Sequence, residues 1–123
     1  MLAMPQVTIP VVDRFSKGIY AREITIPAGT CLTGRVHKYE NLNILSKGDM
    51  SVMTETGVVR VQAPFTVVSP PGTKRIAYAH TECVWTTIHG TNETDVDKIE
   101  LEFTAADETE YLSFVGSLQI TGE

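Results

Sequence analysis

The sequence predicts an all-β barrel followed by one or two short C-terminal helices, and two observations lead to that prediction. Up to residue 89, β-type runs recur at a spacing of roughly ten residues, each closed by Gly, Pro or a polar turn, which is typical of a sandwich or a barrel. Beyond Gly90 the apolar residues take the three- and four-residue spacing of a helix. With 123 residues, of which 42% are hydrophobic, the chain can bury one core, so we expect a single domain.

The strands are placed by their alternating side chains and the turns by Pro and Gly. We expect strands over residues 6–12, 19–26, 31–37, 41–47, 49–55, 58–62, 65–69, 75–80 and 83–89. Proline fixes φ and glycine permits a positive φ, so these residues mark chain reversals. The reversals fall at residues 27–29, 47–49, 56–57 and 70–72. The expected connectivity is therefore a meander of hairpins.

Two helices are expected after the last strand. Thr94 can cap the first and Asp107 the second, because short polar side chains accept hydrogen bonds from the free N–H groups of a helix start. The apolar residues of these helices are Val96, Ile99, Phe103, Tyr111, Leu112, Phe114 and Val115. We expect the second helix to lay one face on the barrel or on a partner subunit. The domain thus consists of a β-barrel over residues 1–92 and an acidic helical segment over residues 93–123.

Charge is distributed unevenly along the chain. Residues 1–92 carry nine Lys or Arg against six Asp or Glu, a balance of +3, whereas residues 93–123 carry nine acidic residues against Lys98 alone, a balance of −8. The net charge of −5 argues against general nucleic-acid binding, which needs a continuous basic face to displace phosphate counterions. The net charge does not argue against a local basic pocket in the barrel.

The compartment is predicted from what the sequence lacks. The segment MLAMPQVTIPVVDRF has no basic start, no long apolar stretch and no cleavage site, and no run of about 18 apolar residues occurs in the chain. We therefore expect a soluble, cytoplasmic protein without a membrane partner. Cys31 and Cys83 are the only cysteines, and their separation predicts neither a disulfide framework nor a zinc knuckle. We expect both to be buried thiols.

Two segments resemble the two sequence motifs of the cupin family. They are GRVHKYENLNILSKG at residues 34–48 and PPGTKR at residues 70–75. The first cupin motif has the form G-x5-H-x-H-x3,4-E-x6-G, and Gly48 matches its closing glycine. This alignment puts Arg35 at the first His place and His37 at the second. Asn41 then stands at the usual Glu place.

The second cupin motif has the form G-x5-P-x-G-x2-H-x3-N. Pro70 and Gly72 match it, while Arg75 stands where the third His would be. Ala79 occupies the Asn place, with His80 beside it. The metal-ligand places of the family are thus mostly filled by other residue types.

The resemblance covers about residues 20–89 and implies a cupin-type double-stranded β-helix, the jelly-roll barrel. The stretch from YAREITIPAGT to TTIHGT also resembles small cupin-like proteins of tailed bacteriophages, whose activity the resemblance does not settle. A phage origin would place the protein in the cytoplasm of the host cell.

The polar residues of the two motifs are predicted to form one pocket, because side chains at i and i+2 of a strand point to one face. The candidate ligand-binding residues are Arg35, His37, Asn41, Asn43, Lys74 and Arg75. A guanidinium keeps its proton at any working pH and presents five donors in a planar fork, so it suits a carboxylate or phosphate rather than a metal. The small Ala77 and Ala79 would leave room beside Arg75, and Lys74 would lie at the mouth.

Several of these residues also have a purely structural interpretation. Arg35 and Arg75 could form ion pairs with acidic side chains on neighbouring strands. The candidate partners are Glu23, Glu40 and Glu82. His37 could be a hydrogen-bonded interior histidine. Trp85 and Tyr78 are expected in the core or a subunit interface, with stacking on a ligand as the alternative.

The main functional alternative is a metal-dependent cupin enzyme of isomerase or dioxygenase type. Imidazole and carboxylate groups can together bind iron, zinc or manganese. The residues available for such a site are His37, Glu40, His80 and His89. Glu40 requires a one-residue slip from the family spacing, and His80 is also explained as a solvated turn residue. A structural or accessory virion protein is a third alternative.

The leading hypothesis is a non-catalytic binding protein that holds a small anionic ligand in the barrel mouth. It needs no cofactor, and a divalent metal belongs to the enzyme alternative. If the phage resemblance holds, a nucleotide-like ligand is attractive, because sequestering a host signalling nucleotide needs binding without turnover. An exposed sheet edge and the C-terminal helix predict a homo-oligomer, a dimer or a higher assembly.

Overall fold

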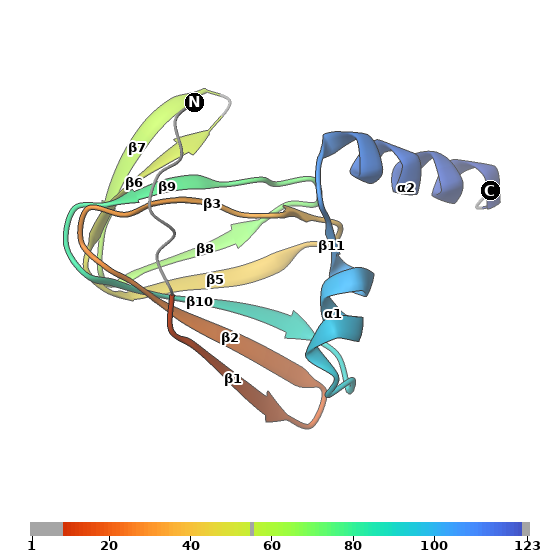
Figure 1. Ribbon diagram of the computed structural model, residues 1–123. Coiled ribbons are helices and arrows are strands. Elements are labelled where there is room, and N and C mark those ends of the chain that lie inside the picture. The colour runs from red at the N-terminus through yellow and green to blue at the C-terminus, as the bar shows by residue number, and fades with distance from the viewer. Residues whose placement is uncertain (1–8, 55, 122–123) are drawn as a thin grey trace.

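The computed structural model describes residues 9–54 and 56–121, which form two large antiparallel β-sheets, one two-stranded sheet and two helices (Figure 1). The first sheet has the strand order β1 (Val11–Ser16), β2 (Ile19–Ile26), β10 (Cys83–Gly90), β5 (Asn41–Lys47) and β8 (Phe65–Ser69). The second has the order β3 (Cys31–Thr33), β9 (Ile76–Ala79), β6 (Asp49–Thr54) and β7 (Gly57–Gln62). The short strands β4 (Val36–His37) and β11 (Thr104–Ala105) pair with each other. The predicted mostly β fold with two C-terminal helices is confirmed.

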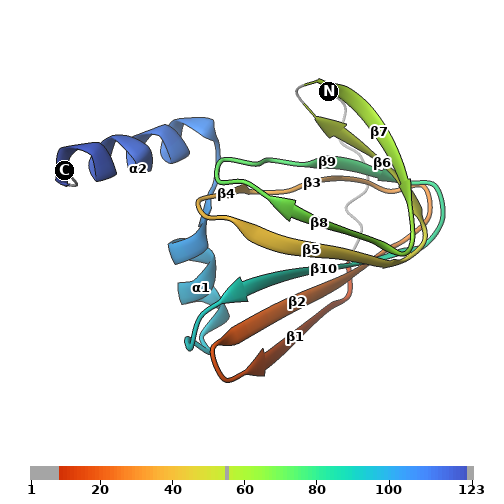
Figure 2. The ribbon, with the colours of Figure 1, turned by 180° about the vertical axis from the view of Figure 1, so that it is seen from behind.

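The two sheets are joined by one hydrophobic core. The first sheet contributes Ile24, Ile26, Leu45, Cys83 and Trp85, and the second contributes Met50, Val52, Val61 and Ala79. All of these residues are at least nine-tenths buried. Inward-facing apolar side chains alternate with outward-facing side chains along the strands. Each sheet therefore presents one apolar face, and the two apolar faces pack together. Figure 2 shows the first sheet from its outer side.

Most strands lie where the sequence predicts them, and the first and third differ. The predicted strand over residues 31–37 is divided into β3 and β4 around Gly34 and Arg35. The predicted strand over residues 6–12 overlaps only the start of β1, and residues 1–8 lie outside the described residues. All six residues of β1 are exposed, so this edge strand lacks the alternation by which a half-buried strand is predicted.

The turn between β5 and β6 requires glycine for two reasons. Gly48 has a φ of +103°, which side-chain-bearing residues rarely adopt. A Cβ atom at Gly48 would also lie 2.5 Å from the carbonyl oxygen of Glu82 and 2.6 Å from Sγ of Cys83. The closing glycine of the first motif therefore lets two strand connections approach closely.

Helix α1 (Val96–Phe103) lies beside the ends of β1, β2 and β10 (Figure 1). Its N-cap is Asp95 and not the predicted Thr94: Oδ1 of Asp95 accepts a hydrogen bond of 3.0 Å from the backbone N–H of Asp97. Ile99 and Phe103 of α1 are buried and form a second apolar cluster with Tyr20. The helix thus packs against one end of the barrel.

Helix α2 (Glu108–Thr121) projects away from the barrel (Figures 1 and 2). Asp107 caps it as predicted, since its Oδ1 accepts a 2.8 Å hydrogen bond from the N–H of Glu110. The ring of Phe114 packs edge-on against Tyr39, with 5.7 Å between ring centroids. Leu112 is 57% exposed, so α2 touches the body with part of its apolar surface and leaves another part uncovered.

The two cysteines differ in burial. Cys83 is buried, whereas Cys31 is exposed, so the expectation of two buried thiols is wrong for Cys31. Leu32 packs against the core from the middle of β3, and the alternation of a strand therefore turns Cys31 outward. Neither helix in the described part of the chain is long and apolar enough to span a bilayer.

Candidate functional site

A cavity of about 500 Å³ lies between the two sheets. Its wall carries three arginines, two histidines and two asparagines: Arg22, Arg35, Arg75, His37, His89, Asn41 and Asn43. Side chains of α1 and of the residue after it, including Glu100, Phe103 and Thr104, complete the wall at one end. Five of the six predicted ligand-binding residues therefore face one space.

Arg22 lines the cavity although it is not among the six candidate ligand-binding residues. It lies on β2, in register with Asp13 of β1 and Thr87 of β10, and all three side chains line the cavity. The signal for it is the inward parity of β2, because Arg22 falls between the buried Tyr20 and Ile24. Arg22 itself is exposed, so strand parity and not burial places it at the cavity.

Arg75 precedes β9 and is partly buried in the cavity wall. Its guanidinium donates a hydrogen bond to Oγ of Ser69, and its Cζ lies 5.7 Å from the centroid of the Trp85 ring. Burial lowers the pKa of Arg75, although a guanidinium stays protonated at neutral pH. No carboxylate within the described residues forms an ion pair with it. Arg75 is thus a partly desolvated cation with further N–H donors available.

Arg35 is held in place from the C-terminal segment. Its Nε donates a 2.7 Å hydrogen bond to Oγ1 of Thr104 and lies 3.3 Å from Oε1 of Glu100. Arg35 thus forms an ion pair, as the structural alternative predicted, but its partner is Glu100 of α1 and not one of the three predicted acidic residues. The side chain of Glu100 is 49% exposed, so water screens this pair.

The three acidic residues suggested as arginine partners lie elsewhere. Glu23 forms an ion pair with Arg14, and Glu82 forms one with Lys47. Glu40 is exposed in the loop between β4 and β5. They therefore do not neutralise the cavity arginines.

His37 and His89 form a stacked pair, with 5.5 Å between their ring centroids. His89 also packs against Phe103, at 4.8 Å. The Nδ1 atoms of both histidines are buried and have no hydrogen-bond partner within the described chain. Burial, followed by the nearby His89, Arg75 and Arg22, lowers the pKa of His37 to about 4. Burial also lowers the pKa of His89, so both rings are neutral at pH 7.

Asn43 is the centre of a buried hydrogen-bond network. Its Nδ2 donates to Oδ1 of Asn41 at 2.7 Å and to Oγ of Ser69 at 2.8 Å. Its Oδ1 accepts from Nε1 of Trp85 at 3.2 Å and from Oγ1 of Thr87 at 2.8 Å. These four bonds use the whole hydrogen-bonding capacity of the amide. Asn43 therefore supports the wall, while Asn41 keeps a donor available.

Lys74 does not line the cavity. It is exposed and borders a separate shallow hollow with Pro70, Pro71 and Gly72. Arg75 borders both this hollow and the cavity, whereas Lys74 borders the hollow alone. The predicted position of Lys74 at the mouth of the cavity does not match this arrangement.

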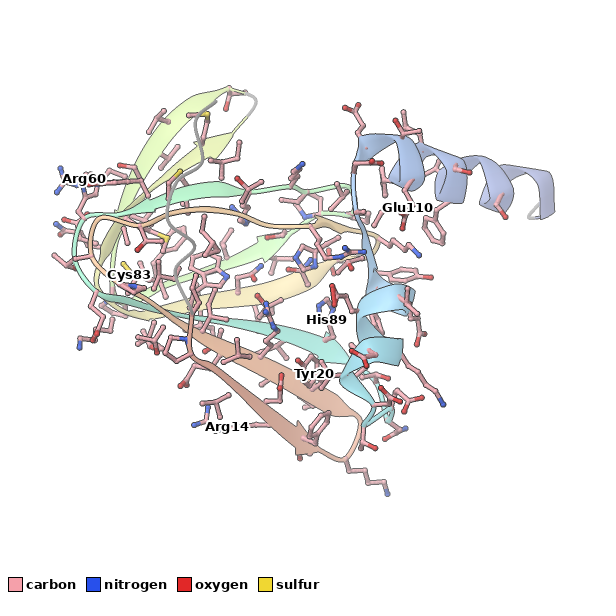
Figure 3. All side chains as sticks on the ribbon, viewed as in Figure 1. Arg14, Tyr20, Arg60, Cys83, His89 and Glu110 are labelled. Carbon is pink, nitrogen blue, oxygen red and sulfur yellow. The ribbon has the colours of Figure 1, made fainter. Side chains whose placement is uncertain are left out.

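The four residues of the alternative metal set do not meet. His37 and His89 are adjacent, whereas His80 is exposed and lies 2.7 Å from Oγ of Ser51, in the connection that precedes β10. His89 lies near the other end of β10, as its separation from Cys83 in Figure 3 shows. Within residues 9–54 and 56–121, no group of three His, Cys, Asp or Glu side chains could hold a metal ion.

Comparisons with known proteins identify the fold. No protein-family model matches the sequence, and no curated protein matches it. Among solved structures, a cupin domain from Bordetella pertussis Tohama I is similar over 72% of this chain and 99% of its own, with 18% identity and a TM-score of 0.54. A cupin superfamily protein from Desulfitobacterium hafniense DCB-2 is similar over 74% and 84%, with 6% identity and a TM-score of 0.58.

An acetylacetone dioxygenase from Acinetobacter johnsonii is also similar, over 67% of this chain and 59% of its own, with 19% identity and a TM-score of 0.55. The fold of the chain is therefore the cupin fold, as the motif resemblance implied. At these identities the similarity establishes the fold alone, and the same fold supports unrelated functions. The function therefore depends on the chemistry of the cavity.

Proposed function

We propose that this protein is a non-catalytic binding protein that holds a small organic anion inside its barrel. The observation that carries the proposal is the guanidinium of Arg75, which is partly buried in the cavity and has no carboxylate partner within the described residues. Arg22 and Arg35 line the same space. Removing a cation from water without a partner is unfavourable, and a bound anion would supply that partner.

The charges of the cavity wall support the same conclusion. The wall contains two carboxylates, Asp13 and Glu100, against its three arginines. Asp13 accepts a hydrogen bond from the Tyr20 hydroxyl, and Glu100 lies beside Arg35. The formal excess is one positive charge, so a ligand with one negative charge would balance the cavity.

A resident metal ion does not fit these residues. His37 and His89 would be its only nearby ligands, and no third His, Cys, Asp or Glu side chain of the described residues completes the site. Each guanidinium close to a dication would add repulsion, of about 4 kcal/mol for a pair of unit charges at intermediate dielectric. The residues of the cavity wall therefore favour an anion over a metal ion. The metal-dependent enzyme alternative is supported only by the similarity to dioxygenases of the same fold.

The proposal includes nucleotides, sugar phosphates and carboxylates as ligand classes. A phage protein that sequesters a host signalling nucleotide would be one instance of it. Its test is a calorimetric titration of the wild type with members of each class at constant ionic strength, repeated with Arg75→Gln. Arg14→Gln is the matched control, because Arg14 is exposed and lies outside the cavity (Figure 3).

We expect at least one anion to bind the wild type and Arg14→Gln with equal affinity. The same anion should bind Arg75→Gln about tenfold more weakly or worse, because a charged hydrogen bond is lost. The proposal is wrong if no anion binds, or if Arg75→Gln binds every anion as the wild type does. Elemental analysis of protein purified without chelator tests the enzyme alternative. A stoichiometric transition metal that is lost in His37→Ala would establish a metal site instead.

A further inference from the structure

The cavity has a polar end and an apolar end. On β2 the inward-facing residues are, in order, Tyr20, Arg22, Ile24 and Ile26. Strand β10 runs antiparallel to β2 and pairs His89 with Tyr20 and Trp85 with Ile24. The polar residues of both strands therefore lie at the end near α1, and the apolar residues lie at the other end.

The remaining strands repeat this division. On β5, the buried Asn41 and Asn43 are followed by the fully buried Leu45. Arg75 precedes β9, and the next inward-facing residue of that strand is Ala77. The division is thus shared by several strands, while α1 adds the apolar Val96, Ile99 and Phe103 beside the polar end.

The apolar end offers a ligand few hydrogen-bond partners. Its lining includes Ile26, Leu32, Met50, Val52 and Ala77. None of these side chains has a nitrogen or oxygen atom, and Nε1 of Trp85 already donates to Asn43. A nucleobase or sugar placed there would lose its hydrogen bonds to water without replacement, which is unfavourable, whereas an alkyl or aryl group would gain from leaving water.

We infer that the ligand is an amphipathic organic anion, with one carboxylate or phosphate-like head group near Arg75 and Arg35 and a compact apolar body between Met50 and Trp85. This inference rests on the proposed function and narrows its ligand class. A cavity of about 500 Å³ lies within the range of small-molecule sites. Trp85 lies at the boundary of the two ends, with the guanidinium of Arg75 over its ring.

The inference is tested with a series of unbranched carboxylates from acetate to octanoate, together with benzoate and phenylpropionate. Phosphate, citrate and AMP serve as hydrophilic anions, and octanol and octanamide as neutral analogues. Trp85 is the only tryptophan of the chain, so its fluorescence reports binding at the cavity. We expect affinity to rise about fourfold per added methylene until the cavity is filled, and the hydrophilic anions to bind more weakly than octanoate.

Ala77→Phe places extra volume at the apolar end without changing any charge. We expect it to abolish the gain in affinity with chain length. Ala106→Phe is the matched control, because Ala106 is exposed and outside the cavity. If Ala77→Phe does not fold, the ligand series on the wild type still decides the question.

The outcomes separate this inference from the proposed function. Affinity independent of chain length, or a preference for AMP, overturns the inference, while loss of binding in Arg75→Gln would still support an anion site. Octanol or octanamide binding as tightly as octanoate, with no effect of Arg75→Gln, overturns both.

Discussion

The guanidinium of Arg75 lies over the ring of Trp85, with 5.7 Å between Cζ and the ring centroid, at the boundary between the polar and the apolar end of the cavity. This contact and the hydrogen bond to Ser69 hold the cation in place. They do not neutralise it, because the interaction of a cation with an aromatic face is weak compared with a carboxylate partner. The arrangement therefore suits a guanidinium that binds the negative charge of a ligand.

Replacing Arg75 with an apolar residue should keep or raise the stability of the protein and weaken anion binding. In Arg75→Met the free energy of unfolding without ligand should stay equal or rise by about 1 kcal/mol, because an apolar side chain replaces a desolvated charge. Anion binding should fall at the same time. Urea denaturation measures the first effect and titration the second. A clear loss of stability without loss of binding would show that Arg75 has a structural role only.

The histidine pair predicts that stability falls in mild acid. His37 has a pKa of about 4 in the folded protein, below the ordinary value of 6.5, so the unfolded chain takes up the proton first. The free energy of unfolding should therefore decrease as pH falls from 6.5 to 4, by on the order of 3 kcal/mol for His37. The lowered pKa of His89 acts in the same direction.

The measurement is urea denaturation at several pH values across that window. His37→Gln should flatten the pH dependence, whereas His80→Gln, a change at an exposed histidine, should leave it as in the wild type. An unchanged slope in His37→Gln would contradict the assignment of the effect to the buried pair.

The network around Asn43 predicts a large effect when its amide is replaced by an apolar side chain of the same branching. Asn43→Leu would leave Nε1 of Trp85 and Oγ of Ser69 without a bond that Asn43 now provides. A buried group left without its partner costs about 1–3 kcal/mol, so the variant should lose on the order of 3 kcal/mol of stability. Thermal and urea denaturation measure the loss. A loss below about 0.5 kcal/mol would mean that the network is not a stabilising element.

The turn at Gly48 predicts a contrast between two glycines with positive φ. Gly48→Ala would place its Cβ 2.5 Å from a backbone oxygen, whereas a Cβ at Gly29, which has a φ of +80°, would meet no heavy atom within 4 Å. Gly29→Ala should thus lose only the conformational term of about 1–2 kcal/mol. Gly48→Ala should lose clearly more. Equal losses in urea denaturation would show that the close approach does not matter.

The strands of the sheets are well predicted because side-chain alternation and Pro or Gly turns are local features of the sequence. The bounds of β2 and β5 agree with the expected ranges, and the predicted Pro and Gly turns fall between strands. Strand β1 begins later than the sequence predicts, since an edge strand with all residues exposed has no alternation to detect. The helix cap is Asp95 instead of Thr94 because these two adjacent residues are both good caps, and local sequence does not distinguish them.

The site is predictable where strand parity applies and unpredictable where the fold brings distant segments together. Parity places Arg35, His37, Asn41 and Asn43 in one pocket, and all four line the cavity. The position of Lys74 depends on how the chain turns after Gly72, and the ion pair between Arg35 and Glu100 depends on where α1 packs. Neither is encoded in local spacing.

A crystal structure of the protein with the tightest-binding anion of the series tests the central claim most directly. We predict that the acidic group of the ligand lies within hydrogen-bond distance of Arg75, inside the cavity, with its apolar body toward Met50. An anion bound on the outer surface, or a transition metal bound by His37 and His89 in the cavity, would contradict the account.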